Sequence, residues 1–345
     1  MIRPYQKDDE VEINNLFTEV FHKQRSIPHW EWKYKGNVLN KTIVTVAEEN
    51  KEIAGHVALV PFKGKWFHEN IYLGARTDTM VSPKHRGKGI YKDLNVEMIQ
   101  QASEQGLDYL FGYPAPKAKE LFLKYTGAQE IGFVPRLMKI NKVSNLLESR
   151  FSALKLAKPL LKWADVFFRS KNTSLPTGYR IESKTAADSS FDELWERGKQ
   201  LSNISLVRDA DFINWRFTNH PDWDYSILAL YKEEKLIGYI VTRTEEKQYG
   251  TGKVLNGYIV DVFADGEKEV WDLLISAGIQ NLHEADVIQT WALDHTLLFK
   301  CLTSTFSFKH KDSPMPLVGK KITESLSDGI SLSDWYITPA DVDSF

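Results

Sequence analysis

A repeated segment is the feature of this sequence that most limits how the chain can fold. The stretch "RSIPHWEWKYKGNVLNKTIVTVAEENKEIAGHVAL" from Arg25 aligns without a gap with "RDADFINWRFTNHPDWDYSILALYKEEKLIGYIVT" from Arg208, and Trp32 matches Trp215 at the same offset of 183 residues. In both copies an aromatic-rich segment leads to two strand-like runs joined by a charged turn. Two copies of one fold are the simplest explanation, and chance agreement at a few positions is the alternative.

Length and composition agree with a soluble chain of two domains. The 345 residues fit two domains of ordinary size, and a net charge of -2 gives no basic excess, so nucleic acid is not an expected partner. No stretch approaches the ~20 apolar residues of a membrane span. Cys301 is the only cysteine and cannot form an internal disulfide. We therefore expect a cytoplasmic protein in a reducing compartment, with Cys301 as a small buried hydrophobe.

A change of composition near the middle predicts the domain division. Residues 142–178 place Leu146, Phe151 and Leu161 among basic residues at roughly helical spacing and end in the turn formers "NTSLPTG". We predict a first domain over residues 1–141, a helical connector over 142–178 and a second domain over 179–345. A basic helix lying on a membrane surface is the alternative for the connector.

The order of elements in the first half predicts an α/β fold with a mixed sheet. The pattern indicates strands first paired by hairpins and later separated by helices, which is typical of a mixed, mostly antiparallel sheet flanked by helices. The expected elements are a strand over 2–5, a helix from 7–9 onward, two hairpin strands, a strand over 71–81, a helix over 89–104, a strand over 109–112, a helix over 117–125 and closing strands over 131–140.

The stretch "VSPKHRGKGIYKDL" from Val81 lies where a strand-like run gives way to a helix-like one. Helix N-termini expose unpaired backbone N–H groups that bind phosphate, and glycines let the backbone approach a ligand closely. Gly87 and Gly89 lie at that junction beside Lys84, Arg86 and Lys88. The motif is neither a Walker loop nor a complete Rossmann fingerprint. By itself it fits a tight turn or a pyrophosphate cradle equally well.

In its context this stretch resembles the cofactor motif of the GNAT superfamily of acyl-CoA-dependent N-acetyltransferases, Gln/Arg-x-x-Gly-x-Gly/Ala after a "V-x-P" segment. Val81, Pro83, Arg86, Gly87 and Gly89 match, whereas Lys84 stands where Gln or Arg is usual and lacks bidentate geometry. The order of elements over the first half matches as well. The resemblance implies acetyl-CoA as co-substrate, with the thioester along the edge of the strand that ends at Val81. The residues expected to bind the cofactor are Met80, Val81, Lys84, His85, Arg86, Gly87, Lys88, Gly89, Ile90 and Tyr91.

The resemblance also implies direct transfer to an amine, with a proton acceptor on the fourth strand and a proton donor for the leaving thiolate. Asp78 is the candidate acceptor, and a structural ion pair with Arg76 or a cap is the alternative. The family's usual tyrosine is missing, because Leu123 stands four residues before Gly127. Tyr125 and Tyr113 are the candidate donors, and water is the alternative.

The matching point of the second copy carries Asp265, Gly266, Glu267 and Glu269. Carboxylates there repel a pyrophosphate, so this half resembles a degenerate GNAT domain that closes one wall of the acceptor site. Asp341 and Asp343 in the C-terminal stretch are expected to attract a cationic amine if the tail is extended, and a frayed tail is the alternative.

Aromatic residues including Trp32 offer either an acceptor surface or core packing. The histidines form no H-x-x-x-H or H-E-x-x-H motif, so we expect no metal site. The whole chain resembles bacterial tandem GNAT proteins. The predicted function is acetyl transfer from acetyl-CoA to a primary amine of a small molecule such as an amino sugar. The alternatives are a non-catalytic CoA-binding regulator or scaffold, and an aminoacyl transferase of cell-wall precursors.

Overall fold

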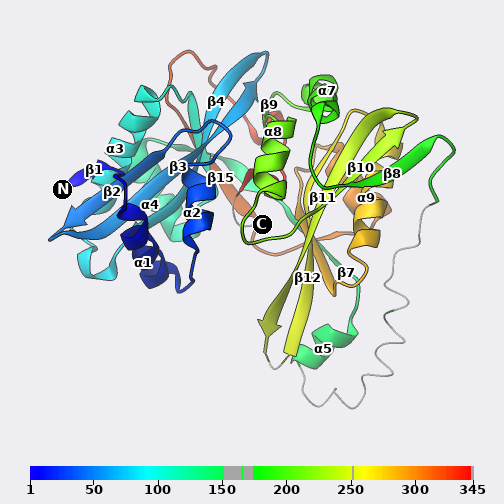
Figure 1. The fold of residues 1–345 in the computed structure, drawn as a ribbon, viewed down its shortest axis with the longest axis horizontal. Helices are drawn as coiled ribbons and strands as arrows, with labels where there is room; N and C mark the ends of the chain where they lie inside the picture. Colours follow the sequence, from blue (N-terminus) through cyan, green and yellow to red (C-terminus); the bar gives the residue numbers. More distant parts are fainter. Residues whose placement is uncertain (151–164, 166–173, 251, 343–345) are drawn as a thin grey trace.

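Two sheets lie side by side in the computed structural model, which describes residues 1–150, 165, 174–250 and 252–342 (Figure 1). In the described residues the first sheet has the order β1 (Ile2–Pro4), β2 (Ile43–Glu49), β3 (Glu52–Trp66), β4 (Glu69–Val81), β5 (Tyr109–Gly112), β15 (Met315–Lys321), β6 (Gln129–Val134), with β9 (Ile204–Leu206) on β3. Its helices are α1 (Asp9–Phe21), α2 (Ile27–Tyr34), α3 (Ile90–Glu104) and α4 (Pro116–Thr126).

Alternating side chains of β2 place this sheet between two apolar layers. Val44 and Val46 pack with residues of α1 and α2, whereas Ile43 and Ala47 pack with α3. In α3 the buried residues Leu94, Met98 and Ala102 recur every four positions, so one face of the helix lies on the sheet.

The second sheet has the order β14 (Lys309–His310), β7 (Arg136–Ile140), β13 (Val287–Trp291), β12 (Gly252–Ala264), β11 (Lys235–Tyr249), β10 (Ser226–Lys232), β8 (Tyr179–Lys184). The helical segments with it are α5 (Ser144–Arg150), α7 (Ser189–Gly198), η3 (Lys199–Leu201), α8 (Ala210–Ile213), η4 (Asn214–Thr218), α9 (Lys268–Asn281), α10 (Leu297–Lys300), η5 (Cys301–Thr305) and η7 (Pro339–Asp341). The short helix η6 (Leu332–Asp334) contacts β6 of the first sheet. Cys301 is buried, as expected.

The two halves repeat one topology. In the first, β2, β3 and β4 pair antiparallel in succession, α3 follows, and β5 pairs parallel with β4. In the second, β10, β11 and β12 do the same, α9 follows, and β13 pairs parallel with β12. This confirms the predicted fold class of two mixed α/β units flanked by helices.

The two sheets exchange strands. β7 pairs with β13 of the second sheet, and β15 inserts between β5 and β6 of the first. The sequence pattern at residues 131–140 predicts two closing strands but not that they join different sheets, because either sheet satisfies the same apolar periodicity. The division into residues 1–141, 142–178 and 179–345 stays a prediction, and most of the connector lies outside the described residues.

Equivalent residues of the two repeats meet where the halves join. α2 and α8 face each other between the sheets, and the C-terminus lies between the halves (Figure 1). The Trp32 and Trp215 rings stack with centroids 4.8 Å apart. Trp32 Nε1 donates to the carbonyl of Trp215 at 2.7 Å, and Trp215 Nε1 donates to the carbonyl of Trp32 at 3.1 Å. This reciprocal contact is what a local two-fold relation between the repeats produces.

Candidate active site

The glycine turn has a left-handed backbone at both glycines and leads directly into a helix. Gly87 and Gly89 have φ values of 82° and 84°, in the left-handed region that favours glycine, and a Cβ at either position would meet nothing within 4 Å. Gly89 is the N-cap of α3, so the unpaired N–H groups of the first helical turn point out of this end. Lys84, Arg86 and Lys88 are exposed around it.

β4 and β5 separate next to this turn. They pair at Leu73–Tyr109, Gly74–Leu110 and Ala75–Phe111, after which β5 ends at Gly112 and β4 continues to Val81. On its other side β4 has a bulge, because the register with β3 shifts between the His56–Met80 and Ala58–Thr77 pairs. The backbone edge of β4 is therefore open to a ligand beyond Ala75.

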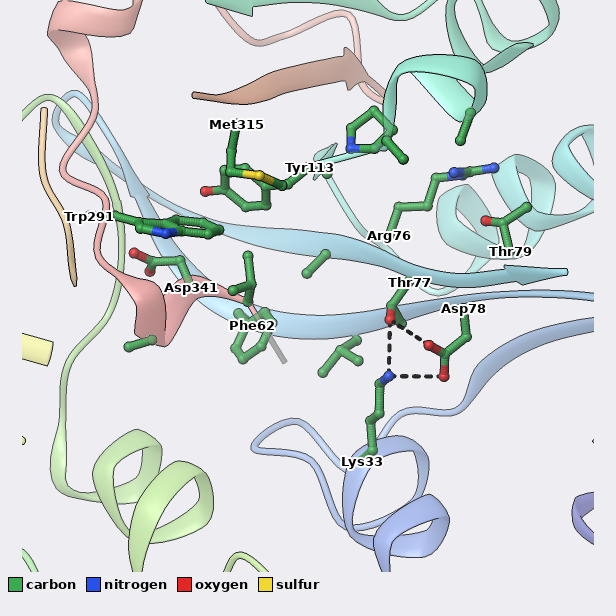
Figure 2. Close-up of a pocket in the computed structure, with 18 of the residues that line it drawn as sticks. Lys33, Phe62, Arg76, Thr77, Asp78, Thr79, Tyr113, Trp291, Met315 and Asp341 are labelled. Carbon is green, nitrogen blue, oxygen red and sulfur yellow. Dashed lines mark hydrogen bonds and ion pairs between the residues drawn. The ribbon is translucent and has the colours of Figure 1, made fainter. Parts of the chain in front are cut away.

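A cavity of about 500 Å³ lies in this opening, with Thr77, Tyr113 and Phe122 from the first half among its lining residues (Figure 2). Met315 of β15 lies beside Tyr113 on the first sheet. The second half and the C-terminal segment supply the opposite wall through Trp215, Arg216, Trp291, Ala340, Asp341 and Val342. The cavity thus lies between the halves, where ligand sites are commonly found. Trp291 and Met315 were not predicted, since no local motif marks residues that only the strand exchange brings together.

Asp78 lies in the bulge, and three side chains contact its Oδ2. Arg25 Nη1 donates to its Oδ2, Lys33 Nζ lies 3.0 Å from the same oxygen, and the Tyr34 hydroxyl donates to it as well. Burial alone would raise the pKa of this carboxyl, but Lys33 and Arg25 outweigh it and hold the pKa far below its usual range. The alternative expected for Asp78 was a structural ion pair with Arg76. Asp78 does form an ion pair, but with Arg25 and Lys33. Arg76 hydrogen-bonds to Asn95 and Tyr91 instead.

The second repeat contains the same ion pair. Arg208, which matches Arg25, donates from Nε to Oδ1 of Asp261 at 3.2 Å, and Asp261 occupies the place of Asp78. The second repeat keeps this pair although its equivalent turn carries acidic residues. The Arg–Asp pair therefore belongs to the architecture of the repeat, and the role of Asp78 as base stays a prediction that this geometry disfavours.

Replacing Asp78 by Asn is expected to lower the free energy of unfolding by roughly 3–5 kcal/mol, because Arg25 and Lys33 would keep buried charges without a counter-ion. Asp261→Asn is the matched control and should cost less, since Arg208 retains Asp341. Urea unfolding measures both. An Asp78→Asn protein of unchanged stability that lost turnover would instead support the base.

Asp341 lies in the short helix η7 rather than in an extended or frayed tail, and it is buried at 3% exposure of its side chain. Arg208 Nη2 lies 3.1 and 3.0 Å from its two oxygens, and the Thr338 backbone N–H donates to Oδ2 at 2.7 Å. Arg208 therefore faces two carboxylates, Asp341 and Asp261. Burial raises the pKa of Asp341 to about 6, although Arg208 opposes the rise. A cation in the cavity would balance this charge.

The two candidate tyrosines have different surroundings. Tyr113 lines the cavity opposite Trp291, and among the described residues its buried hydroxyl has no hydrogen-bond partner. Burial, followed by the nearby Asp341, raises the pKa of Tyr113 well above its usual value. Tyr125 packs on Tyr91 at the outer side of α3 and is absent from the cavity lining. Tyr113 lines the cavity and Tyr125 does not, and the role of either as proton donor stays a prediction.

Three further predictions concern Trp32, Asp343 and the acidic residues of the second half. Trp32 lines the cavity while stacking on Trp215, and its contact with an acceptor stays a prediction. Asp343 lies outside the described residues. In the second half, Asp265 and Glu267 precede α9 at the place equivalent to the glycine turn, and Asp265 pairs with Arg197.

No group of His, Cys, Asp or Glu side chains among the described residues could hold a metal ion. No helix in that part of the chain is long and apolar enough to cross a membrane.

Comparison with known proteins finds a family match for the first part of the chain and a shared fold over nearly all of it. Residues 1–121 match the acetyltransferase (GNAT) domain family. A search of curated proteins gave no match. Among solved structures, a GCN5-related N-acetyltransferase from Anabaena variabilis has a TM-score of 0.66 at 16% identity, covering 94% of this chain and 73% of its own. A probable N-acyltransferase from Enterococcus faecalis has a TM-score of 0.65 at 12% identity. The match covers 93% of this chain and 72% of the other chain. Saccharomyces cerevisiae N-myristoyltransferase with bound myristoyl-CoA has a TM-score of 0.63 at 11% identity. The match covers 92% of this chain and 82% of the other chain. These likenesses show that the fold is shared over both halves.

Proposed function

We propose that this protein, whose residues 1–121 match the acetyltransferase (GNAT) domain family, transfers an acyl group from a CoA thioester directly to a primary amine. One observation carries the proposal: the open edge of β4 and the carboxylate of Asp341 line the same cavity, although they come from different halves. The sequence predicts acetyl-CoA as the donor and a small molecule as the acceptor.

The turn at Gly87 and Gly89 binds the pyrophosphate in this proposal, with the pantetheine chain lying along the open edge of β4. The backbone there has unpaired hydrogen-bonding groups beyond Ala75, because β5 no longer pairs with it. The thioester then lies in the cavity between the halves. Asp78, Arg25 and Lys33 hold the bulge in β4 in position and so act as positioning residues.

Asp341 binds the acceptor as its ammonium ion and takes one proton from it. The neutral amine attacks the carbonyl carbon, a C–N bond forms, and the C–S bond of the thioester breaks. Asp341 passes the first proton to water before the second proton of the attacking nitrogen leaves to Asp341 or water. The CoA thiolate takes a proton from Tyr113, which regains one from water, or from water directly. Tyr113 suits this role by its position, because its hydroxyl is in the cavity wall and has no hydrogen-bond partner among the described residues. Trp291 and Phe62 supply apolar walls that exclude water.

The proposal is tested by measuring release of the CoA thiol with a panel of primary amines that includes amino sugars, together with calorimetry of CoA binding. We expect CoA binding and thiol release that depends on at least one amine. CoA binding without turnover on any amine would favour a non-catalytic CoA-binding protein. Absence of CoA binding would overturn the proposal entirely.

A further inference from the structure

Arg136 carries a positive charge on the cavity wall that the second sheet supplies. It is the first residue of β7, it lines the cavity, and it is opposite Trp291 in the pairing of β7 with β13. Directly opposed residues of antiparallel strands have their side chains on one face of the sheet. Figure 2 shows Trp291, Tyr113 and Asp341 at one end of the cavity, and the rings of Trp291 and Tyr113 have centres 5.5 Å apart. Arg136 therefore follows Trp291 along this wall by one strand spacing, ~4.8 Å.

Lys311 adds a second cation on the same face of the sheet. Its backbone N–H donates to the Arg136 carbonyl at 2.8 Å, beyond the last pair of β14 with β7, so the two residues are opposite each other. The Lys311 Nζ donates to Oε1 of Gln289 at 2.8 Å. Gln289 precedes Trp291 by two residues on β13 and shares its face. Trp291, Arg136 and Lys311 thus form a row across the edge of the second sheet.

No carboxylate balances these two cations. Among the described residues neither Arg136 nor Lys311 forms an ion pair, and the Arg136 guanidinium donates only to the Ser313 carbonyl, 3.4 Å from Nη1. Burial lowers the pKa of Lys311, and the charges of Arg136 and Lys247 lower it further. Lys247 has its own partner in Glu245 at 3.2 Å. An anion beside Arg136 and Lys311 would relieve their repulsion.

The phosphates of CoA lie at the other end of the cavity in the proposed function. The glycine turn joins β4 to α3 of the first sheet, whereas β7 and β14 pair within the second sheet. The side-chain hydrogen bonds of Arg136 and Lys311 go to Ser313 and Gln289, and none goes to the turn or to α3. In Figure 2, Thr79 lies near the end of β4 that leads to the turn, away from Trp291 and Asp341. An anion at Arg136 therefore belongs to the acceptor.

We propose that the acceptor is a primary amine that also carries an anionic group, a carboxylate or a phosphate, which Arg136 binds while Asp341 binds the ammonium. This inference rests on the proposed acyl transfer and names the class of its acceptor. The planar fork of a guanidinium can donate two parallel hydrogen bonds to either anion, and Lys311 adds positive charge behind it. The opposite charges of Arg136 and Asp341 match the two charges of such a molecule and fix its orientation.

Two matched pairs of probes test the inference. 4-Aminobutyrate is compared with butylamine, and 2-aminoethyl phosphate with ethanolamine, so that each pair shares the amine and differs in the anion. Calorimetry titrates each probe at neutral pH into the full chain saturated with free CoA, which carries no acyl group to transfer. We expect the anionic member of at least one pair to bind about tenfold or more tighter, the gain typical of a charge-assisted hydrogen bond. The pair that shows this preference identifies the anion.

Three variants assign the preference to its residues. Arg136→Gln should remove it while leaving the neutral amines and CoA within a few fold of their wild-type affinities. Lys139→Gln is the matched control, because it removes the same charge from β7, but Lys139 is absent from the cavity lining and alternation directs it to the other face of the strand. There the preference should persist. Asp341→Asn should weaken both members of each pair alike, since the ammonium is common to them.

Several results would overturn the inference and leave the proposed function standing. The wild-type protein could bind the members of both pairs with equal affinity, or bind none of the four probes. Arg136→Gln could weaken charged and neutral probes to the same extent, which would assign Arg136 a structural role. Loss of the preference in Lys139→Gln as well would mean that net charge, and not a contact at Arg136, attracts the anion. Failure of CoA itself to bind would overturn the proposed function together with this inference.

Discussion

Replacing Asp341 by Asn is expected to lower kcat at neutral pH by ~10²–10³-fold, the usual contribution of a general base. The assay uses an acceptor amine that supports turnover by the wild-type protein. The wild-type rate should rise with pH through about 6, where Asp341 loses its proton. The variant should lose this inflection and keep only the rise that belongs to the amine. A pH–rate profile of kcat at saturating acyl-CoA measures both effects.

The stability of the same variant separates a catalytic role from a structural one. The pKa of Asp341 is raised from 3.8 to about 6 in the fold, so the folded state binds this proton more tightly than the unfolded state. The free energy of unfolding therefore falls as pH rises from about 4 to 6, by roughly 3 kcal/mol. Asp341→Asn should remove this fall and leave the protein at least as stable at pH 7.5.

Asp261→Asn is the matched control for Asp341. Asp261 pairs with the same Arg208 but is absent from the cavity lining. Its negative charge raises the pKa of Asp341, so its removal should shift the inflection below pH 6 without abolishing turnover. An Asp341→Asn enzyme with wild-type kcat and an unchanged inflection would refute the assignment of Asp341.

Replacing Gly89 by Glu should weaken acyl-CoA binding by at least ~100-fold. The φ of 84° costs a side chain about 1–2 kcal/mol, and the new carboxylate would lie at the N-terminus of α3 where the pyrophosphate binds. Calorimetry with acetyl-CoA measures the loss. Gly89→Ala should lose less, since it adds the strain without the charge.

Gly106→Glu controls for backbone strain in the Gly89 experiment. Gly106 follows α3 at its other end, has a φ of 72°, and a Cβ there would also meet nothing within 4 Å. It should lose stability but retain acyl-CoA affinity. Unchanged affinity in Gly89→Glu would show that the turn is only a tight connection between β4 and α3.

Much of the fold was predictable because its signals are local. The predicted strand over 109–112 and helix over 89–104 agree with β5 and α3 to within a residue, since apolar periodicity and glycine at the helix start mark both. The strand exchange of β7 and β15 was not predictable. Short strands of ordinary composition carry no mark of the sheet that they join.

The candidate site also has one part that the sequence locates and another that only the packing of the two halves creates. The phosphate turn depends on a contiguous stretch whose glycines adopt left-handed φ values, so the sequence alone locates it. Asp341 was noticed as a carboxylate, but its burial beside Arg208 depends on how the C-terminal segment packs between the halves. A structural ion pair with Arg76 was the alternative role expected for Asp78, because alternation alone places both side chains on one face of β4. The bulge directs them differently.

By itself the sequence determined the repeat, the mixed α/β class and the glycine turn, because each is written in neighbouring residues or in a constant offset between copies. Only the tertiary structure decided which charges are balanced. Asp78 has two cations, Asp341 shares one guanidinium with Asp261, and Arg76 has neutral partners alone. Charge balance in a buried site depends on distances between residues far apart in the chain, and those distances arise only when the two halves pack together.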